Sequence, residues 1–324
     1  MPPNATAPLI AFLTPVYNGA TFLRDAMESV QRQDYPNLVH IVVDNASTDS
    51  TPQILSEYAN ARVPVQVTRN EATLPVVENF NRVVELAPKE AKYVKLLCAD
   101  DMVMPAYASK LTAVAERYPS IGIVGCLVHE SNSTEDAKWP ADREVFAGIE
   151  AIRRVFLDQG IIRSPHVLIR RDLLDSRMPF YTPGLFAADT DATLDLLTRC
   201  DWGFVHEDLA LARVHPGTVT NREVFRFNLH YFEWLQLMDS YSPSAFGAAE
   251  RIQLRARFRA HYLRALVRWR LDGRQTLYNR HMSLLKLANK APTAQEYAFA
   301  LWDWALIKAG AHPPWTGWPF DSKI

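Results

Sequence analysis

The segment Val39-His40-Ile41-Val42-Val43-Asp44 is followed directly by the polar turn Asn45-Ala46-Ser47-Thr48-Asp49. The β-branched run is typical of a buried strand, and the polar residues that end it indicate a turn. Apolar residues then recur at helical spacing from Thr51 to Tyr58. A strand, a polar turn and a helix in this order form the first part of a βαβ unit, in which the next strand runs parallel to the first. The segment therefore predicts an α/β fold.

The same alternation recurs on both sides of this segment. Besides Val39–Val43, we predict strands at Leu9–Thr14, Val65–Thr68, Tyr93–Leu97 and Ile121–His129. The residues between them predict helices at Thr21–Gln31, Thr51–Tyr58, Pro75–Leu86 and Ala106–Tyr118. Together these elements predict a doubly wound, mostly parallel sheet with helices on both faces. Such a sheet binds ligands beyond the carboxyl ends of its strands.

The rest of the chain is less regular. Short helices and strands mix from Val145 to His215, ending in the strand-like Trp202–Arg213, and the chain is helical after about Arg222. We therefore expect an α/β domain over residues 1–221, with halves at residues 8–130 and 131–221. Residues 222–324 are expected to form a helical C-terminal appendage.

Composition limits the classes of function. The 324 residues carry a formal net charge of −1, which gives no general attraction for nucleic acid. The three cysteines, Cys98, Cys126 and Cys200, form no Cys-x-x-Cys pair, as is typical of a protein in the reducing cytoplasm. No run approaches the roughly 18 apolar residues that a membrane helix needs. We expect a cytoplasmic protein, with association at the inner face of the membrane left open.

Two of the predicted strand-end loops carry groups that suit a nucleotide. In the first, Pro15, Tyr17 and Asn18 precede Gly19; the Tyr17 ring could stack on a base, and Gly19 would let the backbone turn into the next helix. An ordinary surface turn explains this loop equally well. In the second, Asp44 could accept a hydrogen bond from a ribose hydroxyl or a pyrimidine N–H. Capping of the next helix by Ser47 or Asp49 explains the later residues but gives Asp44 no structural role.

The third loop is Cys98-Ala99-Asp100-Asp101. Adjacent carboxylates repel each other, so this pair needs a cation or a helix N-terminus nearby. Carboxylate oxygens together with substrate phosphates are typical ligands of Mg²⁺ and Mn²⁺. The alternative is that Asp101 caps the following helix.

These loops, in this order and spacing, resemble the family 2 glycosyltransferases of the GT-A fold. The family's Pro-x-Tyr-Asn turn is matched by Pro15, Tyr17 and Asn18, its acidic Ser/Thr-rich turn by Asp44–Asp49, and the last residue of its Asp-x-Asp metal motif by Asp100. There are two departures: Cys98 stands where the first Asp of the metal motif usually lies, and Asn45 replaces a second Asp. The resemblance makes residues 8–130 the nucleotide-binding half and residues 131–221 the acceptor half. It implies that the nucleotide sugar is bound by Pro15, Tyr17, Asn18, Asp44, Asn45, Ala99 and Asp100.

The resemblance extends to about residue 222. In Ala188-Asp189-Thr190-Asp191 it implies that Asp189 is the catalytic base and Asp191 its neighbour. The alternative is that Asp189 is a helix N-cap and that Asp191 favours the helix dipole. Arg213-Val214-His215 resembles the family's Arg-x-His element, which makes His215 a metal ligand together with Asp100 and Asp101. The alternative is a packed or solvated histidine.

We therefore expect an inverting, metal-dependent glycosyltransferase with Mg²⁺ or Mn²⁺ as cofactor. Its donor would be a nucleotide diphosphate sugar of the UDP or dTDP type, and its acceptor a carbohydrate or lipid-linked hydroxyl in polysaccharide or glycoconjugate synthesis. One alternative is a sugar nucleotidyltransferase, although Leu9–Leu23 lacks the Gly-rich, basic loop of that class. The other is a degenerate fold that binds a nucleotide sugar or a partner protein without turnover.

The segment Glu250–Arg274 is rich in arginine and carries apolar residues at helical spacing. A basic amphipathic helix can lie on an anionic membrane, where a lipid-linked acceptor would be found. The alternative, which we favour, is a packed helix with a solvated arginine face. Homo-oligomerisation is left open.

Overall fold

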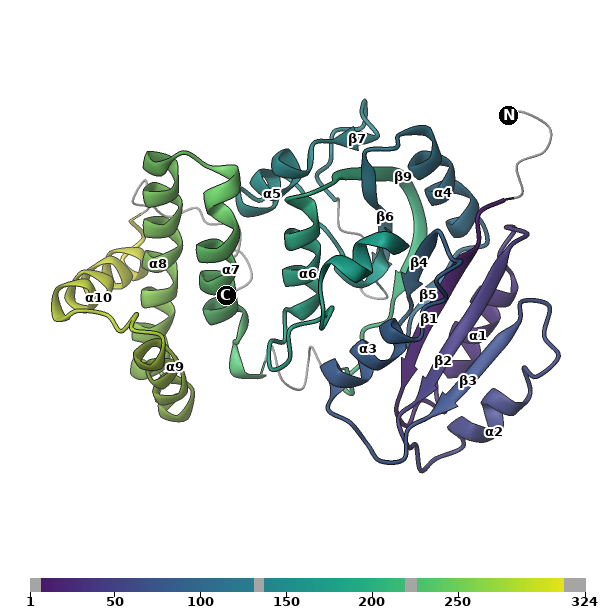
Figure 1. The fold of residues 1–324 in the computed structure, drawn as a ribbon. Helices are drawn as coiled ribbons and strands as arrows, with labels where there is room; N and C mark the ends of the chain where they lie inside the picture. Colours follow the sequence, from purple (N-terminus) through teal and green to yellow (C-terminus); the bar gives the residue numbers. More distant parts are fainter. Residues whose placement is uncertain (1–6, 131–136, 219–225, 312–324) are drawn as a thin grey trace. The chain divides into compact units, whose positions relative to one another are not determined.

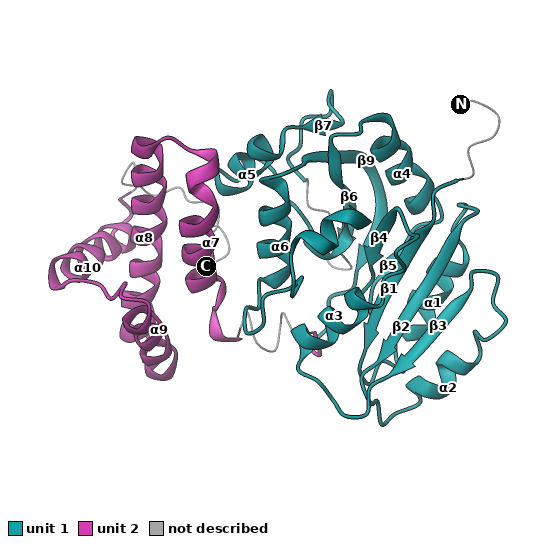
Figure 2. Ribbon diagram, in the orientation of Figure 1, with its two compact units in different colours: residues 1–215 teal, residues 216–324 magenta. Residues whose placement is uncertain are grey.

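The computed structural model describes residues 7–130, 137–218 and 226–311. The chain divides into two compact units, Met1–His215 (unit 1) and Pro216–Ile324 (unit 2) (Figure 2). Unit 1 contains the mixed sheet and its helices, and unit 2 is helical (Figure 1). Among the described residues, no helix combines the length and apolar character that crossing a bilayer requires.

The sheet of unit 1 is built from the predicted strands and several shorter ones. Its order is β3-β2-β1-β4-β8-β6-β9-β5, and β7 pairs with β9. The strands are β1 (Ile10–Val16), β2 (Leu38–Asp44), β3 (Val65–Arg69), β4 (Tyr93–Leu96), β5 (Met102–Val103), β6 (Ile121–Glu130), β7 (Val145–Phe146), β8 (Leu168–Arg170) and β9 (Asp201–Ala212). Strands β3, β2, β1 and β4 pair in parallel, as do β6 and β9. The predicted α/β fold with a mostly parallel sheet is confirmed.

The sequence did not predict the short antiparallel strand β8, which lies between β4 and β6. Only Leu168–Arg170 belong to it, and a three-residue strand is too short to show an alternation of apolar and polar residues. Its insertion separates the two parallel parts of the sheet, which is mixed also because β5 and β7 pair antiparallel with β9.

Helices cover both faces of the sheet, as the alternation of β1 shows. Ile10 and Phe12 lie in one apolar cluster with residues of α1 and α4. Successive strand residues point to opposite faces, so Ala11 and Leu13 face the other side, and α3 packs on β1. The helices of unit 1 are α1 (Leu23–Gln31), α2 (Thr51–Ser56), α3 (Val76–Glu85), α4 (Tyr107–Arg117), α5 (Gly148–Phe156) and α6 (Ala188–Leu197), with 3₁₀ helices η1 (Ser164–His166) and η2 (Arg171–Ser176).

Unit 2 consists of α7 (His230–Ala245), α8 (Ala248–Leu271), α9 (Gln275–Leu287) and α10 (Ala294–Lys308). Helix α8 contacts the other three. The apolar residues predicted at helical spacing in its sequence, including Leu254, Phe258 and Trp269, are buried. The arginine-rich segment is therefore the central packing element of this unit.

Candidate active site

The predicted loops meet at one edge of the sheet because β1 lies between β2 and β4 and all three are parallel. Val16 at the end of β1 is in register with Asp44 at the end of β2. The amide of Asn45 continues this pairing by donating to the Val16 carbonyl at 2.8 Å. Residues far apart in sequence are thus held together by backbone hydrogen bonds.

The first loop is tied to the second mainly through Asn18. Its backbone amide donates to Ser47 Oγ at 2.9 Å, and its side-chain Oδ1 accepts from the Thr48 amide at 2.8 Å. Asn18 has a φ of 48°, so Asn18, rather than Gly19, adopts the left-handed conformation that turns the chain. Gly19 is needed for space, because a Cβ there would lie 2.5 Å from Val16 Cγ2. Tyr17 is 52% exposed at this edge.

The second loop corrects our expectation that Asp44 lacks a structural role. Asp44 forms an ion pair with Arg69 and accepts a hydrogen bond from the Ser47 amide at 3.0 Å. The sequence did not indicate Arg69, but β2 and β3 place it directly opposite Asp44.

The side chain of Asn45 is buried and bonded within the protein. It donates to the Leu74 carbonyl at 2.9 Å and accepts from the Leu74 amide and from Asn70 Nδ2. These contacts fix the segment that precedes α3. Asp49 accepts from the amides of Thr51 and Ala20, so it does bond the start of α2, whereas Ser47 bonds Asn18 instead.

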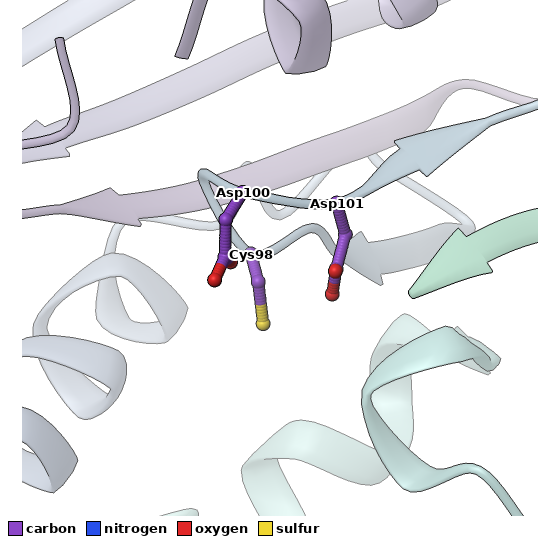
Figure 3. Close-up of side chains that lie close together, drawn as sticks. All are labelled: Cys98, Asp100 and Asp101. Carbon is purple, nitrogen blue, oxygen red and sulfur yellow. The ribbon is translucent and has the colours of Figure 1, made fainter. Parts of the chain in front are cut away.

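The third loop gathers Cys98, Asp100 and Asp101 (Figure 3). Their candidate ligand atoms all lie within 4.8 Å of one another. Burial, followed by the negative charge of Asp100, raises the pKa of Asp101 to about 7. Burial and the same pair of carboxylates raise the pKa of the Cys98 thiol. The Asp101 side chain does not cap α4, whose N-cap residue is Ala106.

The end of β9 closes over this loop. The Arg213 amide donates to Asp101 Oδ1 at 2.9 Å, and Arg213 Nε donates to the Asp100 carbonyl at 3.0 Å. Two residues later, His215 Nε2 lies 3.1 Å from Asp100 Oδ2, and its ring packs against Phe22 at 4.7 Å between centroids. The structure thus brings His215 next to Asp100 from a distant part of the sequence.

These groups fit a divalent cation. Carboxylate oxygens, an imidazole nitrogen and a sulfur atom are all metal ligands. The pKa values of Asp101 and Cys98 are raised partly because neighbouring negative charge disfavours their ionised forms, and a cation would remove that penalty. The most direct ligand pair would be Asp100 and His215.

Two buried groups lie beneath the loop, and the sequence analysis gave neither of them a part in it. Lys95 Nζ donates to the carbonyls of Leu96 at 2.7 Å and Pro165 at 2.5 Å, and burial lowers its pKa to about 8. His166 is buried with Nε2 3.5 Å from Asp101 Oδ2, and burial lowers its pKa. A lysine inside the apolar run Tyr93–Leu97 was the sequence signal that could have identified the first of them.

Asp189 and Asp191 lie in the first turn of α6, whose N-cap residue is Ala187, so Asp189 is not the N-cap. Asp191 pairs with Arg177 and accepts from Thr182 Oγ1 at 2.7 Å. Among the described residues no cationic side chain pairs with Asp189, which accepts from the Thr190 amide at 2.7 Å.

Asp189 also interacts electrostatically with the third loop. Its charge is one of the causes that raise the pKa of the Cys98 thiol. Burial raises the pKa of the Asp189 carboxyl itself. The structure thus places Asp189, and not Asp191, as an unpaired carboxylate near the candidate metal ligands.

Sequence comparison identifies a family over the first part of the chain. The family model described as Glycosyl transferase family 2 matches residues 11–177, just over half of the chain. A relative from Bacillus subtilis (strain 168), the putative teichuronic acid biosynthesis glycosyltransferase TuaG, is 27% identical over 177 residues, which cover 51% of this chain and 69% of that protein.

Solved structures share the fold over nearly the whole chain. The S. aureus TarS 1–349 structure in complex with UDP-GlcNAc aligns with a TM-score of 0.71 at 15% identity, covering 95% of this chain and 93% of that one. The mannosyltransferase PcManGT from Pyrobaculum calidifontis, in complex with GDP-Man and Mn²⁺, aligns with a TM-score of 0.57 at 16% identity, covering 96% and 82%. At these identities the likeness concerns the fold.

Proposed function

Because this chain belongs to glycosyl transferase family 2, we propose that it is an inverting enzyme that transfers a sugar from a nucleotide diphosphate donor to an acceptor hydroxyl. Glycan synthesis is the setting that its glycosyltransferase relatives support. The observation that carries the proposal is the meeting of Asp100, His215 and the two preceding loops at one edge of the sheet. Ligands of such sheets bind beyond the carboxyl ends of the strands.

The donor would lie along the three loops. Exposed Tyr17 would stack on the base, while Asn18 and Ala99 would line the nucleotide path. Asn45 would act indirectly, because its buried side chain holds the segment before α3 in place. Asp44 would act chiefly by holding the second loop, since its carboxylate is already paired with Arg69. TarS with UDP-GlcNAc and PcManGT with GDP-Man support a nucleotide sugar as donor. We favour a UDP or dTDP donor.

The diphosphate would be bound together with Mg²⁺ or Mn²⁺ through Asp100 and His215, with Asp101 behind them. The cation would supply Lewis-acid stabilisation of the charge that develops on the departing nucleotide. The Mn²⁺ in the PcManGT complex supports this requirement. Arg213 would keep the loop in place through its bonds to Asp100 and Asp101.

Asp189 is the proposed general base. It would accept the proton of the acceptor hydroxyl as that oxygen attacks the anomeric carbon from the face opposite the leaving nucleotide. One in-line displacement forms the new glycosidic bond, breaks the bond to the diphosphate and inverts the anomeric configuration. The raised pKa of the partly exposed Asp189 suits this role, because a stronger base removes a hydroxyl proton more readily. Asp191 would hold the α6 start through Arg177 and Thr182.

The acceptor would be a carbohydrate or lipid-linked hydroxyl reached from the Asp189 side. All three cysteines are free, which supports the proposed cytoplasmic location. Contact with the inner face of the membrane would bring the enzyme to a lipid-linked acceptor.

The proposal can be tested with UDP, dTDP and GDP sugars, each assayed with and without Mn²⁺. A matching donor at a hundred times its dissociation constant should stabilise the protein by roughly 2.7 kcal/mol in a thermal-shift measurement. Released nucleotide diphosphate and the anomeric configuration of the product then report transfer. Asp100→Asn should lose the metal-stimulated part of nucleotide binding while unfolding as the wild type does.

Binding of no nucleotide sugar under any metal condition would refute the proposal. Binding without transfer or donor hydrolysis would instead identify a non-catalytic nucleotide-sugar protein. Release of pyrophosphate from a nucleoside triphosphate and a sugar phosphate would identify a nucleotidyltransferase.

A further inference from the structure

Cys98 differs from the other two cysteines in what surrounds it. Cys126 belongs to the apolar core of unit 1, and Cys200 is buried with Sγ bonded to the Leu196 carbonyl at 3.3 Å. Cys98 is only partly buried and shares a loop with Asp100 and Asp101. A cysteine that serves only to fill a core is expected among apolar groups, as the other two are. Cys98 instead stands among carboxylates.

The geometry of the loop puts the thiol where a ligand would be. Cys98 Sγ and one oxygen from each carboxylate all lie within 4.8 Å of one another. Figure 3 shows the Cys98, Asp100 and Asp101 side chains projecting to the same side of the loop. His215 reaches the Asp100 carboxylate from β9 at 3.1 Å and adds a nitrogen ligand to the same neighbourhood.

A second observation concerns the buried residues next to Asp101. His166 is 5% exposed, its Nε2 lies 3.5 Å from Asp101 Oδ2, and its Nδ1 has no hydrogen-bond partner among the described residues. Lys95 Nζ holds the Pro165 carbonyl next to it at 2.5 Å. This buried polar layer orients Asp101, as outer groups commonly orient the ligands of a metal site.

We propose that Cys98 is a metal ligand in its own right, so that this site favours thiophilic divalent cations such as Zn²⁺, Co²⁺ or Cd²⁺ over Mg²⁺. Thiolate is a soft ligand, whereas Mg²⁺ selects oxygen. A site with one sulfur, one nitrogen and carboxylate oxygens therefore binds Mg²⁺ less selectively than a site with oxygen ligands alone. The inference rests on the proposed function in one respect, since it concerns the cation that would accompany the donor.

The test uses the full chain and compares the wild type with Cys98→Ser, Cys98→Asp and, as matched control, Cys200→Ser. Cys200 is buried at the start of β9, away from the strand-end loops, and serine keeps its bond to the Leu196 carbonyl. Each protein is titrated with Co²⁺, with and without UDP, while near-ultraviolet absorbance reports thiolate-to-cobalt charge transfer. Calorimetry then gives the affinities for Cd²⁺ and Mg²⁺.

The wild type and Cys200→Ser should both show the charge-transfer band, and both Cys98 variants should lack it. Loss of an outer-shell partner typically weakens metal binding by 10–100-fold, so loss of a ligand should weaken Cd²⁺ binding by about tenfold or more. Cys98→Asp should at the same time gain in Mg²⁺ affinity relative to Cd²⁺.

Bound Co²⁺ without the band in the wild type, or a band that persists in Cys98→Ser, would overturn the inference while leaving the proposed transfer reaction standing. Absence of any metal binding with UDP present would overturn the inference and the metal requirement together. Failure of every nucleotide sugar to bind, with the cobalt band intact, would refute the proposed function alone.

Discussion

The strand-end loops of unit 1 and helix α8 of unit 2 both collect charges of one sign, but they compensate these charges differently. In the loops, Asp100 and Asp101 are adjacent, and within the described residues their ion-pair partners are the histidines His215 and His166. The negative charge of one carboxylate raises the pKa of the other. Within the described ranges, no lysine or arginine side chain forms an ion pair with either carboxylate.

The arginines of α8 are in the opposite situation. Arg255 pairs with Asp239, Arg259 with Glu296, and Arg264 with Asp303. The helix also buries most of its large apolar residues, although Ile252 and Leu271 are exposed. Composition alone made both regions candidates for a functional surface. The contacts support a ligand site only in the loops, because no arginine or lysine of the described residues forms an ion pair with Asp100 or Asp101. For α8 they favour the packed-helix interpretation.

The largest expected effect concerns the unpaired carboxylate near the loops. Asp189→Asn keeps the shape of the side chain but removes its basicity, so transfer should fall by roughly 10²–10⁴-fold, with donor binding nearly unchanged. Initial rates of product formation and donor titrations measure the two quantities.

Asp191→Asn is the matched control for this prediction. Asp191 is paired with Arg177 and accepts a hydrogen bond from Thr182. Its replacement should therefore lower the free energy of unfolding and have a milder effect on the rate of transfer than Asp189→Asn. An inactive Asp191 variant beside an active Asp189 variant would show that the two roles are exchanged. Near-normal transfer by both would place the base elsewhere.

The next largest effect should come from the buried ion pair in unit 2. Arg264 Nη1 lies 2.7 Å from Asp303 Oδ2, and the two side chains are 8% and 1% exposed. Arg264→Leu removes this guanidinium from the buried Asp303 carboxylate, which should reduce the free energy of unfolding by about 3–5 kcal/mol. Urea denaturation of the full chain measures the change.

An exposed pair on the same helix gives the comparison. Arg255→Leu breaks the pair with Asp239 and should cost less than about 1 kcal/mol. The double variant Arg264→Leu/Asp303→Leu should recover most of the loss, since it also removes the buried carboxylate that the single variant separates from Arg264. Equal losses in the free energy of unfolding for Arg255→Leu and Arg264→Leu would contradict the expected difference between an exposed and a buried ion pair.

A smaller effect should appear with pH. His281 is buried, its Nδ1 lies 2.6 Å from the Tyr262 hydroxyl and its Nε2 2.7 Å from the Phe227 carbonyl, and burial lowers its pKa from 6.5 to about 4. The unfolded chain therefore binds a proton that the folded chain excludes, and stability falls as pH drops from about 6.5 towards 4.

At pH 5 this histidine alone should cost on the order of 2 kcal/mol relative to pH 7. His281→Gln should reduce the loss between pH 7 and pH 5 by about that amount, measured as the free energy of unfolding in urea at both pH values. The same pH dependence in wild type and variant would show that His281 is not held neutral.

The strand-end loops could be predicted because short segments of sequence determine where each strand ends and which residues follow it. Apolar runs such as Val39–Val43 fix the strands, parallel pairing fixes which ends meet, and Asp100 follows from its place after β4. The sequence could also propose His215, although its approach to Asp100 depends on the tertiary course of β9.

The rest depended on packing between distant segments. The Asp44–Arg69 pair arises from strand register, and the Asp191–Arg177 pair from the fold around α6. Which of Asp189 and Asp191 forms an ion pair cannot be read from the sequence, because the two lie only two positions apart in one helical turn. Likewise, an arginine face gives no sign in sequence of whether acidic partners lie opposite it.

The smallest effect is expected where α8 is offered an anionic surface. A basic residue close to such a surface contributes about 1 kcal/mol, but Arg255, Arg259 and Arg264 already meet carboxylates. Arg257, Arg270 and Arg274 are, with Arg255, the exposed arginines of the segment Glu250–Arg274. Recovery of the protein in low salt should therefore be nearly equal with neutral and anionic liposomes in a sedimentation assay. Recovery that is strong only with anionic vesicles, falls with salt and is lost in Arg257→Gln/Arg270→Gln would instead make α8 a membrane-contacting helix. In that case α8 would be a binding surface like the loops of unit 1, even though several of its arginines are paired with carboxylates.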